Sequence, residues 1–91
     1  MWCVVYTSVN PVRRDYPFIS SYVQYCGDSE DAAFDELERL ADLCVANGCA
    51  LEDSRDNLYN TIQSKEYTFS QDAKSGNKLY HNFRMYFDHE L

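Results

Sequence analysis

The chain has 91 residues, of which 45% are hydrophobic and 15% aromatic, and its formal net charge is −7. This length supports one hydrophobic core, so we expect a single domain over residues 1–91. Only three Gly and two Pro are present, which argues against a disordered or repetitive chain. No apolar run reaches the roughly 20 residues that cross a bilayer, and no basic leader precedes the first apolar run. We therefore expect a cytoplasmic protein (in a host cytoplasm if a phage encodes it) without membrane contact.

The first two elements are predicted to be paired strands. Trp2–Ser8 carries apolar residues on both faces, which is typical of a central strand, and Pro11 ends it. Phe18–Cys26 has two interpretations. Its apolar residues fall on one helical face, but it is rich in aromatic and β-branched residues, which favours a strand paired with the first.

The next element is predicted to be an amphipathic helix. Asp28 and Ser29 can each cap its start, and Gly48 occupies the position of a left-handed stop. Apolar residues repeat with helical period between these ends and form an arc of roughly 140°, enough to pack on a sheet. They are Ala33, Phe34, Leu37, Leu40, Ala41, Cys44 and Val45.

The segment Leu51–Ser64 is predicted to contain a second, shorter helix. Ser54 would cap this helix. Its buried side would consist of Leu58, Tyr59 and Ile62.

The C-terminal third is predicted to form a β-hairpin. Glu66–Gln71 is a short strand, Asp72–Asn77 is a Gly-containing turn, and Leu79–Asp88 alternates between apolar and polar residues. The expected fold class is α+β, an antiparallel sheet of three to four strands. One long amphipathic helix, with the shorter helix as an optional second, would pack on one face of that sheet.

Negative charge is concentrated in the middle of the chain. Residues 28–56 contain ten acidic and two basic residues, a net charge of −8, whereas the remaining residues sum to +1. Five of these acids follow one another at steps of three or four residues, so on a helix they form one stripe about 20 Å long. The five are Asp28, Asp31, Asp35, Glu38 and Asp42.

The acidic stripe has two interpretations. It is either a solvated face that keeps the protein soluble, or a surface complementary to a basic groove of another protein. The same charge argues against direct binding of nucleic acid or anionic membranes. The predicted partner-binding residues are Asp28, Asp31, Asp35, Glu38, Asp42, Glu52, Asp53 and Asp56.

The length, the acidity and the acidic helix resemble those of phage and plasmid inhibitors that block nucleic-acid-handling defence enzymes. Some anti-CRISPR and anti-restriction proteins are of this kind. The resemblance lies in composition and rests on no shared motif. It implies a non-enzymatic inhibitor or modulator that binds a basic, nucleic-acid-handling protein or complex.

Residues suited to catalysis or metal binding are few, and we expect no cofactor and no enzymatic activity. Cys3, Cys26, Cys44 and Cys49 would support the alternative of a small metal or thiol protein, but their spacing lacks two close ligand pairs. His81 lies among apolar residues, where a structural histidine is the commoner case. A Cys–His nucleophile pair involving His81 is the minor alternative.

The last predicted strand supplies a second candidate interface. Tyr80, Arg84 and Tyr86 alternate with the apolar residues and so lie on the opposite face. Aromatic and Arg side chains are frequent anchors of protein interfaces. If no helix covers that face, we expect it to form a second contact surface or the seam of a homodimer. In the homodimer alternative, the negative charge of the protein would serve solubility only.

Overall fold

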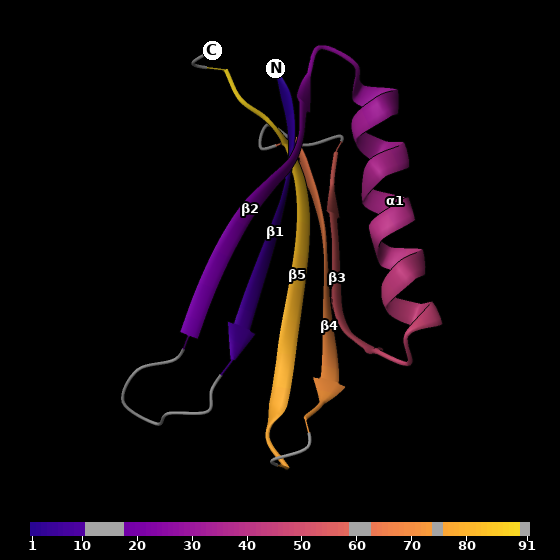
Figure 1. Cartoon of the computed structure of the whole chain (residues 1–91). Coiled ribbons are helices and arrows are strands. Elements are labelled where there is room, and N and C mark those ends of the chain that lie inside the picture. Colours follow the sequence, from indigo (N-terminus) through magenta and orange to yellow (C-terminus); the bar gives the residue numbers. More distant parts are fainter. Residues whose placement is uncertain (11–17, 59–62, 74–75, 90–91) are drawn as a thin grey trace.

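The computed structural model describes residues 1–10, 18–58, 63–73 and 76–89 of the chain. These residues form five strands and one helix in the order β-β-α-β-β-β (Figure 1). The helix α1 spans Glu30–Ala46. The strands are β1 (Trp2–Asn10), β2 (Phe18–Gly27), β3 (Ala50–Asn57), β4 (Ser64–Asp72) and β5 (Lys78–Phe87).

The five strands form one antiparallel sheet with the order β2-β1-β5-β4-β3. β1 is an inner strand, as its two apolar faces predicted, and it pairs with β2 on one side and β5 on the other. The strand interpretation of Phe18–Cys26 is confirmed, because β2 covers that segment and pairs with β1. The predicted hairpin of β4 and β5 is also present, while residues 74 and 75 of its turn lie outside the described residues.

Both ends of α1 follow from local chemistry, and the predicted helix is present between them. The Ser29 side chain accepts a hydrogen bond from the Ala32 backbone N–H at 3.1 Å, which caps the first turn. Gly48 adopts a φ of +82°, and the backbone N–H of Cys49 donates to the Cys44 carbonyl, which together close the helix in a Schellman motif. Within the described residues, no helix is both long and apolar enough to cross a membrane.

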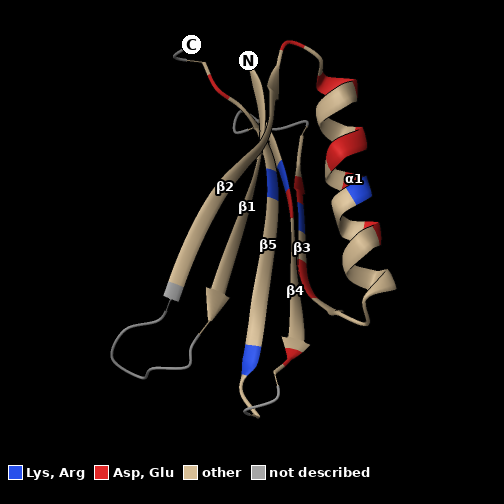
Figure 2. Cartoon of the chain, viewed as in Figure 1, with Lys and Arg blue, Asp and Glu red and all other residues tan. Residues whose placement is uncertain are grey.

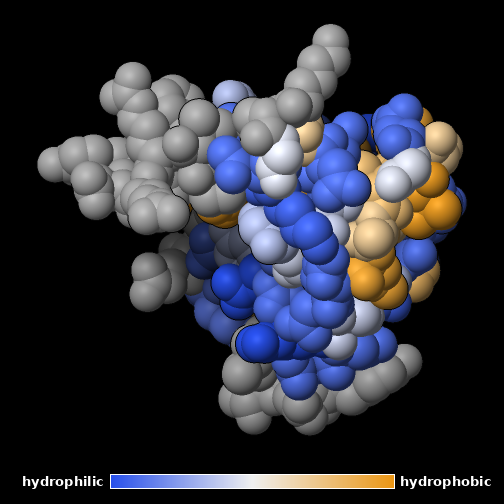
Figure 3. Space-filling model, turned by 90° about the horizontal axis from the view of Figure 1, so that it is seen from below, coloured by the Kyte–Doolittle hydropathy of each residue, from blue (hydrophilic) through white to orange (hydrophobic). Residues whose placement is uncertain are grey.

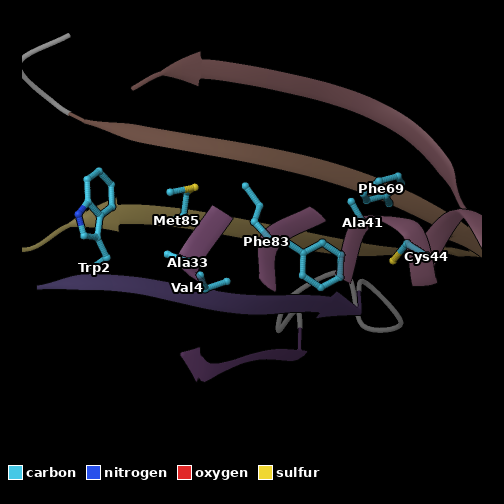
Figure 4. Close-up of a cluster of buried hydrophobic side chains, with 9 residues drawn as sticks. Trp2, Val4, Ala33, Ala41, Cys44, Phe69, Phe83 and Met85 are labelled. Carbon is cyan, nitrogen blue, oxygen red and sulfur yellow. The ribbon is translucent and has the colours of Figure 1, made fainter. Parts of the chain in front are cut away.

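The core lies between α1 and one face of the sheet. Leu37 of α1, Val4 of β1 and Met85 of β5 are fully buried there. Trp2 and Met85 lie toward one end of the buried cluster, and Phe69 lies toward the other (Figure 4). This arrangement uses one face each of β1, β4 and β5, so the opposite face of the sheet is not covered by α1.

The predicted fold class, an α+β domain with three to four strands and a long packed helix, is wrong. The described residues contain five antiparallel strands and a single helix of 17 residues, so the fold is mostly β. The difference arises mainly from an additional edge strand, β3.

The predicted second helix is wrong because β3 occupies its beginning. Ser54, the predicted cap, lies opposite Tyr67 in the pairing of β3 with β4. β3 is exposed along nearly its whole length, so its sequence carries no buried alternation that would indicate a strand. Backbone pairing with β4 outweighs the local helix signals. Leu58 packs against the core, and Tyr59 and Ile62 lie outside the described residues.

Candidate functional site

The eight predicted partner-binding residues lie on two neighbouring parts of the fold. Five belong to α1 or the bend that precedes it, and three belong to the edge strand β3. Acidic residues of both elements occur on the same side of the molecule (Figure 2). The spacing of three and four residues keeps the helical carboxylates on one flank of α1.

Four of these carboxylates are exposed and carry no ion pair with any described residue. The helix N-terminus favours negative charge near its first turn only, so Asp35 and Asp42 gain little stabilisation from it. We call this set the acidic face. It consists of Asp28, Asp31, Asp35 and Asp42.

The fifth residue of the stripe, Glu38, is neutralised by the protein itself. Lys65 of β4 places its Nζ 3.5 Å from Glu38 Oε1, and the Tyr67 hydroxyl donates to the same oxygen at 2.6 Å. Lys65 also lies 3.9 Å from Asp56 Oδ2 and packs its ammonium over the Phe34 ring. Burial opposes the Lys65 charge, but the hydrogen bond with Tyr67 and the neighbouring negative charges outweigh it and raise the pKa of Lys65.

The acids of β3 are also paired within the protein. Arg55 Nε lies 3.0 Å from Asp53 Oδ2, and Lys78 Nζ lies 4.0 Å from Glu52 Oε1. Glu52 additionally accepts a hydrogen bond from the Ser70 hydroxyl at 2.5 Å. Together with the pair of Asp56 and Lys65, these contacts leave β3 much less negative than its sequence suggests.

Arg39 is the basic residue of α1, and it does not neutralise the acidic face. Its guanidinium forms an ion pair with Glu36, three residues earlier on the neighbouring flank. The hydrogen bond from Arg39 lowers the pKa of Glu36, against the opposing effect of burial. The positive charge of Arg39 is therefore paired with Glu36 and not with the acidic face.

Exposed aliphatic side chains adjoin the acidic face at the C-terminal end of α1. Val45 follows Asp42 by three residues, which places the two side chains next to each other on the helix surface. Val45 is 61% exposed, and Leu51 at the start of β3 is 56% exposed. In the view from below, hydrophobic surface gathers on the side of the molecule where α1 lies (Figure 3). An apolar contact area thus lies beside the unpaired carboxylates.

The second predicted interface lies on the sheet face that α1 does not cover. Arg84 is exposed and stacks on the Tyr86 ring, with 5.2 Å from its guanidinium carbon to the ring centroid. Tyr80, four residues before Arg84 on β5, is also exposed. A shallow cavity of about 330 Å³ lies on this face and includes Arg84, Tyr86 and Glu66 in its lining. Its lining is mainly polar, so it lacks the apolar centre typical of a tight interface.

A second cavity, of about 610 Å³, lies between α1 and the sheet and brings His81 near two cysteines. His81 Nδ1 lies 2.6 Å from the Tyr6 hydroxyl, and Nε2 lies 3.1 Å from Gln71 Oε1. These contacts suit a neutral ring, and burial lowers the pKa of His81. Burial and the neighbouring Cys49 raise the pKa of Cys44 to about 12. In the described part of the chain, the two ring nitrogens of His81 contact Tyr6 and Gln71, and neither contacts a thiol.

The four cysteines form two separate pairs. Cys3 of β1 lies against Cys26 of β2, and Cys44 of α1 lies against Cys49. The described part of the chain contains no group of three or more His, Cys, Asp or Glu side chains that could hold a metal ion. The arrangement therefore does not bring the four sulfurs to one point.

No family model, curated protein or solved structure matches this chain. Any functional interpretation therefore depends on the geometry of its own residues.

Lys65 and Tyr67 are the residues of this region that sequence reasoning missed. They fix Glu38 in place and separate it from the acidic face. Tyr67 lies on the predicted strand Glu66–Gln71, whereas Lys65 lies just before it, and a contact across 27 or 29 residues leaves no local pattern in the sequence.

Proposed function

We propose that this chain is a non-enzymatic binding protein that docks its acidic face on a basic surface of a partner protein. The observation that carries the proposal is the contrast between the two groups of acids. Glu38 and the acids of β3 have cationic partners within the protein, whereas the acidic face has none among the described residues.

The energetics of the helix favour a binding role for these carboxylates. Asp31 and Asp35 lie four residues apart on α1, and like charges at this spacing repel by roughly 0.2–0.5 kcal/mol in isolated helices. A partner's Lys or Arg side chains would relieve this repulsion on binding. Long-range attraction would also speed the encounter, since complementary charge raises association rates.

The partner that fits best is a nucleic-acid-handling protein with a phosphate-binding groove. From Asp31 to Asp42 the face extends about 16 Å, which is several phosphate spacings along a strand. Val45 adds an exposed apolar side chain beside the carboxylates. A nucleic-acid backbone has no such group next to its phosphates, but a groove in a protein partner can accommodate one. The protein would act as an inhibitor or modulator in the cytoplasm that holds such a partner, in the manner of anti-CRISPR and anti-restriction proteins.

The test is capture of a partner from extracts of the native host with three forms of the immobilised protein. The first is the wild type. The second is Asp31→Asn, Asp35→Asn, Asp42→Asn, which removes three charges from the acidic face with little change of shape. The third is Glu52→Gln, Asp53→Asn, Asp72→Asn, which removes three exposed charges elsewhere.

The proposal predicts a protein held by the wild type and by the third form but not by the second. An added DNA or RNA duplex should compete for that protein if its groove binds phosphates. Equal loss with both variants would show that only net charge matters and would contradict the proposal. Equal capture by all three forms would also contradict it.

A further inference from the structure

Cys3 and Cys26 face each other across the first two strands. They are direct partners in the register of β1 and β2, and Trp2 pairs with Gly27 one position further on. The two sulfur atoms are 3.0 Å apart. Both thiols are free in this structure. Trp2 and Val4 face α1 in the core, so Cys3 between them lies on the opposite face of the sheet. The two sulfurs therefore meet on that face, at the end of the hairpin where β2 leads into the helix.

The strand register places Cys3 and Cys26 within reach of a disulfide bond. Directly opposite residues of antiparallel strands have Cα atoms about 4.5–5.5 Å apart, within the range of about 4.4–6.8 Å found for disulfides. The bonded sulfur distance is about 2.05 Å, so the sulfurs need to approach by only about 1 Å. Rotation of the two side chains can supply this movement without a change in strand pairing.

The two thiols differ in accessibility. Cys26 lies on an edge strand and is exposed, whereas Cys3 is only 3% exposed. Burial and the neighbouring Cys26 raise the pKa of Cys3 to about 11, so Cys3 is rarely a thiolate near neutral pH. An oxidant therefore meets Cys26 first, and Cys3 is placed to attack the modified sulfur.

We propose that Cys26 and Cys3 form a redox-responsive thiol pair that closes to a cross-strand disulfide with a low-molecular-weight disulfide as oxidant. The Cys26 thiolate attacks one sulfur of the oxidant, forms a mixed disulfide and releases the first small thiolate. Cys3 then gives up its proton, its sulfur attacks Cys26 Sγ, and the second small thiolate leaves. Two protein thiols are oxidised, one small disulfide is reduced to two thiols, and excess small thiol reverses both steps.

The bond would close the loop that contains the β1–β2 hairpin. Cross-linking a loop of this length restricts the unfolded chain, which should raise the Tm by on the order of 10 °C. It would also fix the end of β2 two residues before Asp28, where the acidic face begins. The proposal does not depend on the binding function, because its readouts are covalent structure and stability.

The test treats the reduced protein with glutathione disulfide, blocks remaining thiols and maps tryptic peptides. Trypsin places Cys3 in residues 1–13, Cys26 in residues 15–39, and Cys44 with Cys49 in residues 40–55, so each linkage is distinguishable. The wild type should yield residues 1–13 linked to 15–39, with a higher Tm that reduction reverses. The Cys49→Ser control should behave in the same way.

Two variants test the order of the steps. Cys3→Ser should stop at the mixed disulfide on Cys26, and Cys26→Ser should leave Cys3 unmodified. The exposed position of Cys26 makes its variant informative even if Cys3→Ser folds poorly. A wild type that accumulates the mixed disulfide with Cys3 free, or that links Cys26 between two chains, would overturn the proposal.

Discussion

Lys65 of β4 and Glu38 of α1 form an ion pair of 3.5 Å that connects the sheet to the helix. The Lys65 side chain is largely buried, and the Tyr67 hydroxyl bonds the same carboxylate oxygen. This contact divides the acidic stripe by function, since it makes Glu38 a structural residue and leaves the acidic face to solvent.

Replacing Lys65 should destabilise the fold more than replacing an exposed lysine. Lys65→Met keeps most of the packing on Phe34 but leaves Glu38 without its cation, so we expect a loss of about 1–2 kcal/mol in the free energy of unfolding. Equilibrium urea unfolding measures this loss. Lys78→Met is the matched control, because Lys78 pairs with Glu52 at the surface and should change stability by less than about 0.5 kcal/mol. Equal effects of the two variants would contradict a structural role for Lys65.

Removing the helix cap should weaken α1. Ser29→Ala loses the hydrogen bond to the Ala32 N–H and should cost about 1 kcal/mol of unfolding free energy. Ser29→Asn keeps a capping oxygen without adding charge and should stay close to the wild type. Thermal unfolding followed by circular dichroism distinguishes the two variants. A loss in Ser29→Asn as large as in Ser29→Ala would show that the cap is not the cause.

Acidification should destabilise the protein through His81. Burial lowers the pKa of His81 in the folded state below its usual value near 6.5, so the unfolded chain binds a proton first as pH falls. The His81 contribution is therefore complete above pH 6.5 and is lost below it, with a slope of at most about 1.4 kcal/mol per pH unit. Urea unfolding at several pH values between about 7.5 and 5 measures this slope.

His81→Gln provides the comparison, because it keeps polar contact toward Tyr6 and Gln71 but has no proton to gain. Its unfolding free energy should change less over the same pH range, whatever its value at neutral pH. Among the described residues, Glu36 is the other group whose pKa is lowered on the acid side, and its contribution is lost only below about pH 4.5. An unchanged slope in His81→Gln would contradict the assignment.

The parts of the fold that the sequence predicts correctly have strong local signals. The helix combines a 3.6-residue apolar repeat with Ser29 and Gly48 at its ends, and the last strand alternates along its length. β3 has neither signal. It is exposed and acidic and contains Ser54, a residue able to cap a helix, and it becomes a strand because β4 offers a free edge.

The candidate site is predictable to the same limited extent. Helical spacing places the four carboxylates of the stripe that belong to α1 on one flank, but it does not predict which cations approach them. Lys65 reaches Glu38 only because β4 folds under that flank, and Arg39 turns toward Glu36. The pairing of Cys3 with Cys26 likewise depends on strand register, which the sequence does not specify at that precision.

The most direct test of the binding proposal is the salt dependence of the dissociation constant for the purified captured partner. The wild type should bind more weakly as NaCl rises, and Asp31→Asn, Asp35→Asn, Asp42→Asn should weaken low-salt binding roughly tenfold or more and flatten the salt dependence. A dissociation constant that neither salt nor this triple variant changes would contradict a role for the acidic face.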